Sequence, residues 1–129
     1  KTGAIIVLER NNNLDFVKNT GDDSNILISP QILETIFFKN SPLHDGAIII
    51  KNNYITATRV VLPISEDKNL ANRFGLRHKA GIGITEKTDA TAIVISEQTG
   101  KITYFKNGDF IKFDSHGELN KLIIEDLTF

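Results

Sequence analysis

The chain has 129 residues, of which 40% are hydrophobic and 24% charged, and this size and balance are typical of one globular domain with its own core. Its formal net charge is -1, from 15 basic and 16 acidic residues, which excludes an overall positive field for nucleic acid, so any anion site must be local. Cysteine is absent, which excludes disulfides, thiol nucleophiles and thiolate metal sites.

The first third of the chain predicts a strand, a polar segment and a helix. Residues 3–8 form an apolar run of strand length, whereas residues 11–25 are rich in asparagine and aspartate and predict mostly loop. Ser29 and Pro30 predict a helix start, because serine suits the N-cap and proline suits the first helical position. The apolar face of this helix would hold Ile32, Leu33, Ile36 and Phe37.

The middle of the chain predicts a hairpin followed by a helix. Residues 47–51 and 54–62 are strand-like, and the two asparagines between them tolerate the positive φ of a tight turn. The segment 75–88 fits two patterns, because its apolar residues alternate as in a strand but also align on one helical face. Two glycines weaken a strand, and we therefore predict the helix.

The last third of the chain predicts three strands and a terminal helix. Residues 90–96 form a near-continuous β-branched run, which is typical of a strand covered on both faces. Residues 101–106 and 110–113 flank an Asn-Gly pair, a strong hairpin signal, and residues 118–127 predict a helix. Together the elements predict an α/β fold in which a central mixed sheet is flanked by helices.

A first polar cluster, His44-Asp45-Gly46, precedes the apolar run 47–51. The pattern is typical of a turn that enters a buried strand, and spacing alone favours that interpretation. The same residues suit a ligand site. A carboxylate at a strand edge can hold a divalent metal or orient a hydroxyl, and glycine lets the backbone approach a bulky ligand.

A second cluster, Arg77-His78-Lys79, follows a glycine at the start of the predicted helix. The N-terminus of a helix binds anions through its free N–H groups and its dipole, and basic side chains strengthen that binding. Positive charge is unfavourable at this position without a ligand, and such departures from local rules often mark functional sites. A solvated charged turn is the alternative, and the sequence gives it equal weight.

A third cluster, Ser96-Glu97-Gln98, ends the predicted strand 90–96. Ligands gather near strand ends in open sheets of this kind, although the residues alone favour a polar hairpin turn. The three clusters together indicate a site for a phosphate-bearing ligand with an accompanying metal. The residues by themselves do not name that ligand.

Taken in order, five motifs resemble those of the diadenylate cyclase domain, most closely the bacterial type carried on membrane-spanning helices. They are Ser29-Pro-Gln-Ile-Leu33, Asn40-Ser-Pro-Leu-His-Asp-Gly-Ala47, Leu62-Pro63, Gly75-Leu-Arg-His-Lys79 and Ser96-Glu97. The likeness extends from residue 3 to the Asn-Gly pair at 107–108. The family condenses two ATP molecules into cyclic di-AMP and releases two pyrophosphates, so the resemblance implies a nucleotidyltransferase.

The resemblance also implies a larger protein around this domain. The sequence contains no methionine, so we expect residues 1–129 to be a single catalytic domain cut from a longer, membrane-anchored bacterial protein, with the domain in the cytoplasm. No apolar run in it approaches the ~20 residues of a membrane-spanning helix. Membrane contact would therefore come only through segments outside this sequence.

Two signature motifs of the family, Asp-Gly-Ala and Arg-His-Arg, can be located residue by residue. The first is intact at residues 45–47, whereas the second matches at Arg77 and His78 but ends in Lys79. Lysine offers a point charge where arginine offers a planar fork with two parallel donors. Relatives commonly have a threonine before this motif, and its hydroxyl is replaced here by Leu76.

The resemblance implies a role for each motif residue. Asp45 would orient or help deprotonate the attacking 3′-hydroxyl, and Arg77 and His78 would complete the catalytic group. A magnesium, manganese or cobalt ion would be held by His44, Asp45 and Glu97. The nucleotide-binding residues would be Asp45, Gly46, Ala47, Leu62, Leu76, Arg77, His78, Lys79 and Ser96.

The resemblance further implies a homodimer, because one domain binds one ATP and the reaction joins two. Two copies would face each other, and nucleic acid would play no part. Lys79 and Leu76 favour an alternative, a non-catalytic adenine-nucleotide sensor with the same fold.

Overall fold

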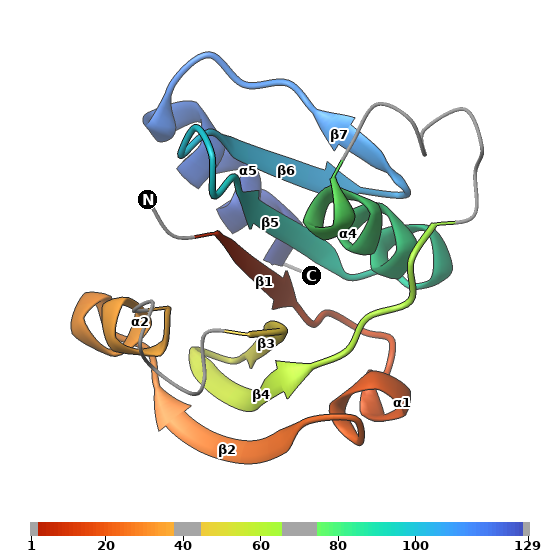
Figure 1. Ribbon diagram of the computed structural model, residues 1–129. Coiled ribbons are helices and arrows are strands. Elements are labelled where there is room, and N and C mark those ends of the chain that lie inside the picture. The colour runs from red at the N-terminus through yellow and green to blue at the C-terminus, as the bar shows by residue number, and fades with distance from the viewer. Residues whose placement is uncertain (1–2, 38–44, 66–74, 128–129) are drawn as a thin grey trace.

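The computed structural model describes residues 3–37, 45–65 and 75–127, and Figure 1 shows one twisted sheet with helices on both sides. The elements in chain order are β1 (Ala4–Leu8), α1 (Asp15–Lys18), β2 (Asp22–Leu27), α2 (Pro30–Ile36), β3 (Ala47–Lys51), β4 (Tyr54–Val60), α4 (Leu76–Lys87), β5 (Thr91–Ile95), β6 (Ile102–Lys106), β7 (Asp109–Ile111) and α5 (His116–Leu127).

The seven strands form one sheet in the order β2-β4-β3-β1-β5-β6-β7. The central pair, β1 and β3, is parallel, and every other pair of neighbours is antiparallel. This arrangement confirms the predicted α/β fold with a central mixed sheet and flanking helices. Because β1 and β3 run in the same direction, the segments that precede them reach the same edge of the sheet.

Two apolar cores lie on opposite faces of the sheet. Successive strand residues point to opposite faces, so Val7 and Ile49 belong to one core and Leu8 and Ile50 to the other. The first core includes residues of α1 and α4, whereas residues of α2 and α5 pack into or against the second. Figure 1 shows α4 and α5 on opposite sides of β5 and β6.

Local signals in the sequence account for the ends of several elements. The Ser29 hydroxyl accepts a hydrogen bond from the backbone N–H of Ile32 at 3.1 Å, which confirms the predicted N-cap of α2. Asn52 and Asn53 both adopt positive φ, 53° and 70°, which confirms the predicted β3–β4 hairpin turn.

The helix predicted for residues 75–88 is confirmed as α4, and its glycines have a packing reason. A Cβ at Gly83 would lie 2.0 Å from the carbonyl oxygen of Pro63. The missing side chain therefore lets the segment that follows β4 run directly against the helix. The N–H of Ser65 also donates to the carbonyl of Lys79 at 3.1 Å, so this segment runs along α4 toward the second polar cluster.

The prediction that residues 11–25 are mostly loop is wrong. Leu14 and Val17 are buried around the short helix α1, and residues 22–27 pair with β4 as the edge strand β2. The strand escaped prediction because four of its six residues are exposed and its pairing is irregular, so apolar residues do not alternate regularly along it.

The predicted strand 54–62 ends at Val60. Among the described helices, none is long and apolar enough to cross a membrane.

Candidate functional site

The three polar clusters meet at one edge of the sheet. Ala4 pairs with Ile95, and Ala47 pairs with Val60, so the starts of β1 and β3 lie beside the ends of β5 and β4. The residues that flank these strand ends therefore gather along a single edge. They are Gly3, Asp45, Gly46, Val61, Leu62, Ser96 and Glu97.

The start of α4 lies against this edge through a contact between Arg77 and Gly3. A Cβ at Gly3 would lie 2.6 Å from the Cζ atom of Arg77, so the absence of a side chain makes room for the guanidinium group. Sequence reasoning missed this role of Gly3. Its only signal is a glycine directly before an apolar strand, which does not identify the residue that will approach it.

A cavity of about 340 Å³, the apolar cavity, opens between the end of β4 and the start of α4. Asp45 and Arg77 supply its charged groups, and most of the remaining wall is aliphatic. Ligand sites commonly combine apolar walls with a few polar groups, and this volume is within their usual range. The lining residues are Ile5, Asp45, Gly46, Val60, Val61, Leu62, Ile64, Leu76, Arg77 and Ala80.

The turn at Asp45-Gly46 is tightly constrained by β4. Gly46 has a φ of +79°, and a Cβ there would lie 2.8 Å from the carbonyl carbon of Arg59. Arg59 itself has a φ of 55°, rare for a residue with a side chain, at an irregular point of the β3–β4 pairing. Its Nε atom pairs with the Asp22 carboxylate at 3.0 Å. The turn predicted before β3 is therefore confirmed, and glycine is required in it.

A second cavity of about 210 Å³, the polar cavity, joins the second and third clusters. The Nη1 atom of Arg77 lies 3.2 Å from the Oε2 atom of Glu97, so an ion pair crosses between α4 and the β5–β6 turn. Leu76 and Arg77 line both cavities, which therefore share a wall. The lining residues are Gly75, Leu76, Arg77, His78, Ile95, Ser96, Glu97 and Gln98.

His78 is held as a neutral imidazole beside the polar cavity. Its ring meets Phe105 edge to face, with 6.1 Å between the ring centroids. Burial lowers the pKa of His78, and the positive charge of Lys101 lowers it further. A neutral imidazole can donate one hydrogen bond and accept another, which suits contact with phosphate oxygens and hydroxyl groups.

Some of the predicted site residues lie away from the two cavities. Ala47 is 1% exposed and belongs to the core. Lys79 lines neither cavity, and its backbone carbonyl accepts a hydrogen bond from the N–H of Ser65 at 3.1 Å. His44 lies outside the described residues.

The predicted metal ligands are divided between the two cavities. Asp45 lines the apolar cavity, and Glu97 lines the polar one. In the ranges 3–37, 45–65 and 75–127, no three histidine, aspartate or glutamate side chains form a group that could hold a metal ion. The role of each residue in binding stays a prediction.

A comparison with protein-family models gives a match over residues 1–110. The matching model is that of the DAC family, described as DisA bacterial checkpoint controller nucleotide-binding. The chain belongs to this family. The family resemblance of the sequence motifs is thereby confirmed.

Curated relatives of this DAC domain carry related names. The diadenylate cyclase of Listeria monocytogenes strain 10403S is 42% identical over 128 residues, which are 99% of this chain and 47% of the relative. The cyclic di-AMP synthase CdaA of Bacillus subtilis is 39% identical over 127 residues, 98% of this chain and 45% of the relative. The chain thus spans about half the length of these relatives.

A solved structure agrees with the fold of this DAC domain. The crystal structure of a double mutant of DacA from Staphylococcus aureus is 34% identical, with a TM-score of 0.93. The match covers 99% of this chain and 85% of the other. A protein from Bacillus cereus described as a hypothetical membrane spanning protein is 38% identical, with a TM-score of 0.83, over 88% of this chain and 56% of the other.

Proposed function

We propose that this domain is a diadenylate cyclase, which condenses two ATP molecules into cyclic di-AMP and releases two pyrophosphates. The observation that carries the proposal is the pair of cavities joined at Leu76 and Arg77. One is mainly apolar with a carboxylate in its wall, and the other is lined by a guanidinium, an imidazole and a serine hydroxyl. The names of the relatives support the same reaction.

The two cavities suit chemically different parts of an ATP molecule. The adenine and ribose would occupy the apolar cavity against Leu62, and the ribose hydroxyls would face Asp45. The phosphates would lie in the polar cavity, where Arg77 and His78 donate hydrogen bonds to their oxygens and Ser96 adds a hydroxyl. Arg77 would contact the α-phosphate because it lines both cavities.

The reaction is a displacement at phosphorus. The 3′-hydroxyl oxygen of one ATP forms a bond to the α-phosphorus of a second ATP, and the bond from that phosphorus to the bridging oxygen of pyrophosphate breaks. The hydroxyl proton passes to Asp45 or to water, and pyrophosphate leaves with the bonding electrons. The protein contributes mainly by positioning the reactants and neutralising charge.

Each domain would bind one ATP, so two copies must face each other for the reaction. The hydroxyl of the nucleotide in one copy then attacks the phosphate of the nucleotide in the other, and a second attack in the opposite sense closes the ring. We therefore propose a homodimer as the active form. A monomer would bind ATP without making product.

A divalent metal fits the donor groups of this site only with help from the substrate. Asp45 and Glu97 offer carboxylate oxygens, but Glu97 already pairs with Arg77. Magnesium sites in such enzymes often use one or two carboxylates together with substrate phosphates, and His44 is a further candidate ligand. Magnesium, manganese or cobalt would supply charge neutralisation on the phosphates when bound.

We also propose that residues 1–129 are one catalytic domain of a longer, membrane-anchored protein that holds the domain in the cytoplasm. The matched curated relatives are about twice as long, and the related Bacillus cereus protein is described as membrane spanning.

A non-catalytic adenine-nucleotide sensor is the second candidate function. Two observations favour it. Lys79 replaces the last arginine of the family motif and lines neither cavity, and Leu76 replaces a hydroxyl residue with an aliphatic side chain that is 67% exposed. The first change replaces a planar guanidinium fork with a point charge, and the second removes a hydroxyl that could contact phosphate.

Product analysis separates the two functions. The protein is incubated with ATP and, in turn, magnesium, manganese or cobalt, and the nucleotides are identified by chromatography and mass spectrometry. A cyclase gives cyclic di-AMP and pyrophosphate at a rate that rises more steeply than protein concentration. ATP binding by calorimetry without product in any metal would contradict the cyclase and support the sensor.

A further inference from the structure

The turn between β5 and β6 carries a lysine that belongs to none of the family motifs. The backbone N–H of Gly100 donates to the carbonyl of Ser96 at 2.9 Å, and the N–H of Ser96 donates to the carbonyl of Lys101 at 3.0 Å. These two hydrogen bonds close the turn and fix the backbone of Lys101 next to Ser96. Ser96 lines the polar cavity, so the backbone of Lys101 lies at the edge of the proposed nucleotide site.

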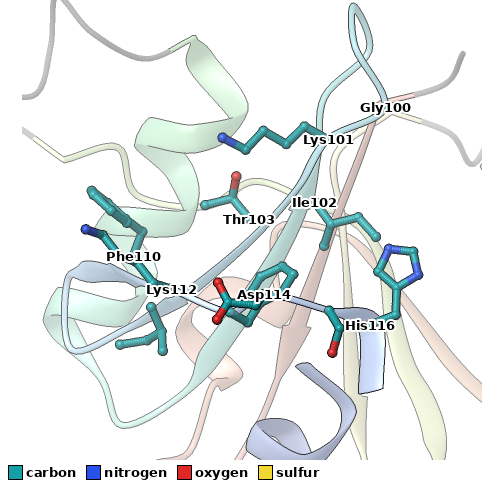
Figure 2. A pocket seen from close by; sticks show the side chains of 11 residues that line it. Gly100, Lys101, Ile102, Thr103, Phe110, Lys112, Asp114 and His116 are labelled. Carbon is teal, nitrogen blue, oxygen red and sulfur yellow. The ribbon is translucent and has the colours of Figure 1, made fainter. Parts of the chain in front are cut away.

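The side chain of Lys101 extends toward α4, which carries Arg77 and His78 (Figure 2). Burial lowers the pKa of His78 and the charge of Lys101 lowers it further, so Lys101 acts on an imidazole that lines the polar cavity. Lys101 is exposed, and no carboxylate of the described residues forms an ion pair with it. The ammonium group is thus available to an anionic ligand.

The polar cavity has too little positive charge of its own for a polyphosphate ligand. Arg77 is the one permanently charged cation among the residues that line it, and Glu97 partly neutralises that charge. Burial and the charge of Lys101 lower the pKa of His78 and so favour its neutral form, and Lys79 lines neither cavity. The polyphosphate of ATP carries several negative charges, more than these groups and one divalent metal together would neutralise.

We propose that Lys101 is a further phosphate-binding residue, whose ammonium group contacts the β- or γ-phosphate of bound ATP from the β5–β6 turn. The inference rests on the proposed function. An ammonium on a flexible four-carbon stem can follow a phosphate chain that extends out of the cavity over Ser96. Lys101 would thereby add a positive charge at the polar cavity, which Lys79 does not line.

The test compares ATP with AMP, which lacks the β- and γ-phosphates. Calorimetry on the whole chain measures the dissociation constants of both nucleotides for the wild type, Lys101→Gln and Lys101→Arg. We expect Lys101→Gln to weaken ATP binding about tenfold, the effect of one charge-assisted hydrogen bond, and AMP binding by less than about twofold. Lys101→Arg keeps the charge and should restore most of the ATP affinity.

Lys112→Gln is the matched control, because Lys112 is exposed and lines, together with Lys101, a third cavity between β6, β7 and the start of α5, the outer cavity, but lies eleven residues further along the chain. It should leave both affinities unchanged. Equal effects of Lys101→Gln on ATP and AMP, or no effect on either while the wild type binds ATP, would overturn this inference alone. A wild type that binds no ATP would overturn the proposed function as well.

Discussion

Two regions of this molecule could each accept a small ligand, and they differ in size and in chemistry. The outer cavity has a volume of about 700 Å³ and lies between β6, β7 and the start of α5 (Figure 2). The apolar and polar cavities are smaller, about 340 and 210 Å³, but contain Asp45, Arg77 and Glu97. The outer cavity contains none of the motif residues. The comparison teaches that the chemistry of the wall, and not its volume, identifies the candidate site.

The first prediction, with the largest expected effect, compares the substitution of one carboxylate in each region. Asp45→Asn should lower cyclic di-AMP formation at least ~100-fold, because it removes the group that orients or deprotonates the attacking hydroxyl. The melting temperature should hold, since Asp45 is exposed. Asp114→Asn, in the outer cavity, is the matched control and should leave turnover unchanged. Equal turnover in both variants would remove Asp45 from the mechanism.

The second prediction exchanges one cation in each region. Arg77→Ala should weaken ATP binding by roughly 10- to 100-fold, because it removes charge-assisted hydrogen bonds to phosphate. Lys112→Ala should not change the affinity. Calorimetry measures both dissociation constants. A stronger effect of Lys112 than of Arg77 would place the nucleotide in the outer cavity instead.

The third prediction concerns a hydrogen-bond network between β6 and α5, which should affect the stability of the fold but not the affinity for ATP. The buried Tyr104 hydroxyl donates to the Asp126 carboxylate at 2.7 Å, and Lys106 donates to the same carboxylate at 2.5 Å. Burial raises the pKa of Tyr104. For Asp126, burial acts to raise the pKa, but the hydrogen bonds from Lys106 and Tyr104 lower it overall.

Tyr104→Phe should therefore reduce the free energy of unfolding by about 1–3 kcal/mol, since it removes one donor from a partly buried carboxylate. Tyr54→Phe is the control, because Tyr54 is 40% exposed. Urea unfolding measures both, and ATP affinity should change in neither. Loss of ATP affinity in Tyr104→Phe at unchanged stability would show that the network belongs to the ligand site.

The smallest effect is a shift in protonation. His78 has a pKa below its ordinary value of 6.5, and the negative charge of bound phosphate should raise that pKa. ATP binding would then be accompanied by proton uptake at His78, and affinity would increase as the pH falls toward the pKa of this imidazole. NMR titration of the His78 ring with and without ATP measures the shift. His116 lines the outer cavity, so a shift at His116 without one at His78 would contradict the proposed placement.

Sequence patterns predicted the fold wherever one residue type determines the local structure. The N-cap at Ser29 and the asparagine turn at 52–53 follow from side-chain chemistry within a few residues. The strand β2 could not be predicted, because its stability comes from pairing with β4 and from only two partly buried side chains. Pairing between segments that are far apart in the sequence produces no local pattern from which a strand could be predicted.

The identities of the site residues were predicted more accurately than their arrangement in space. The motifs identified Asp45, Arg77 and Glu97, and the structure brings them to one edge of the sheet. The division into two cavities, the contact of Arg77 with Gly3 and the unusual backbone of Arg59 depend on strand order and register. These are properties of the assembled sheet, so no single stretch of sequence contains them.

A structure with 3′-deoxy-ATP would test the central claim most directly, because this analogue lacks the attacking hydroxyl and cannot be condensed. We expect the adenine against Leu62 in the apolar cavity, the phosphates beside Arg77 and His78, and two copies of the domain facing each other. Nucleotide bound in the outer cavity, or a monomer with nucleotide bound and the phosphates directed away from Arg77, would contradict the account.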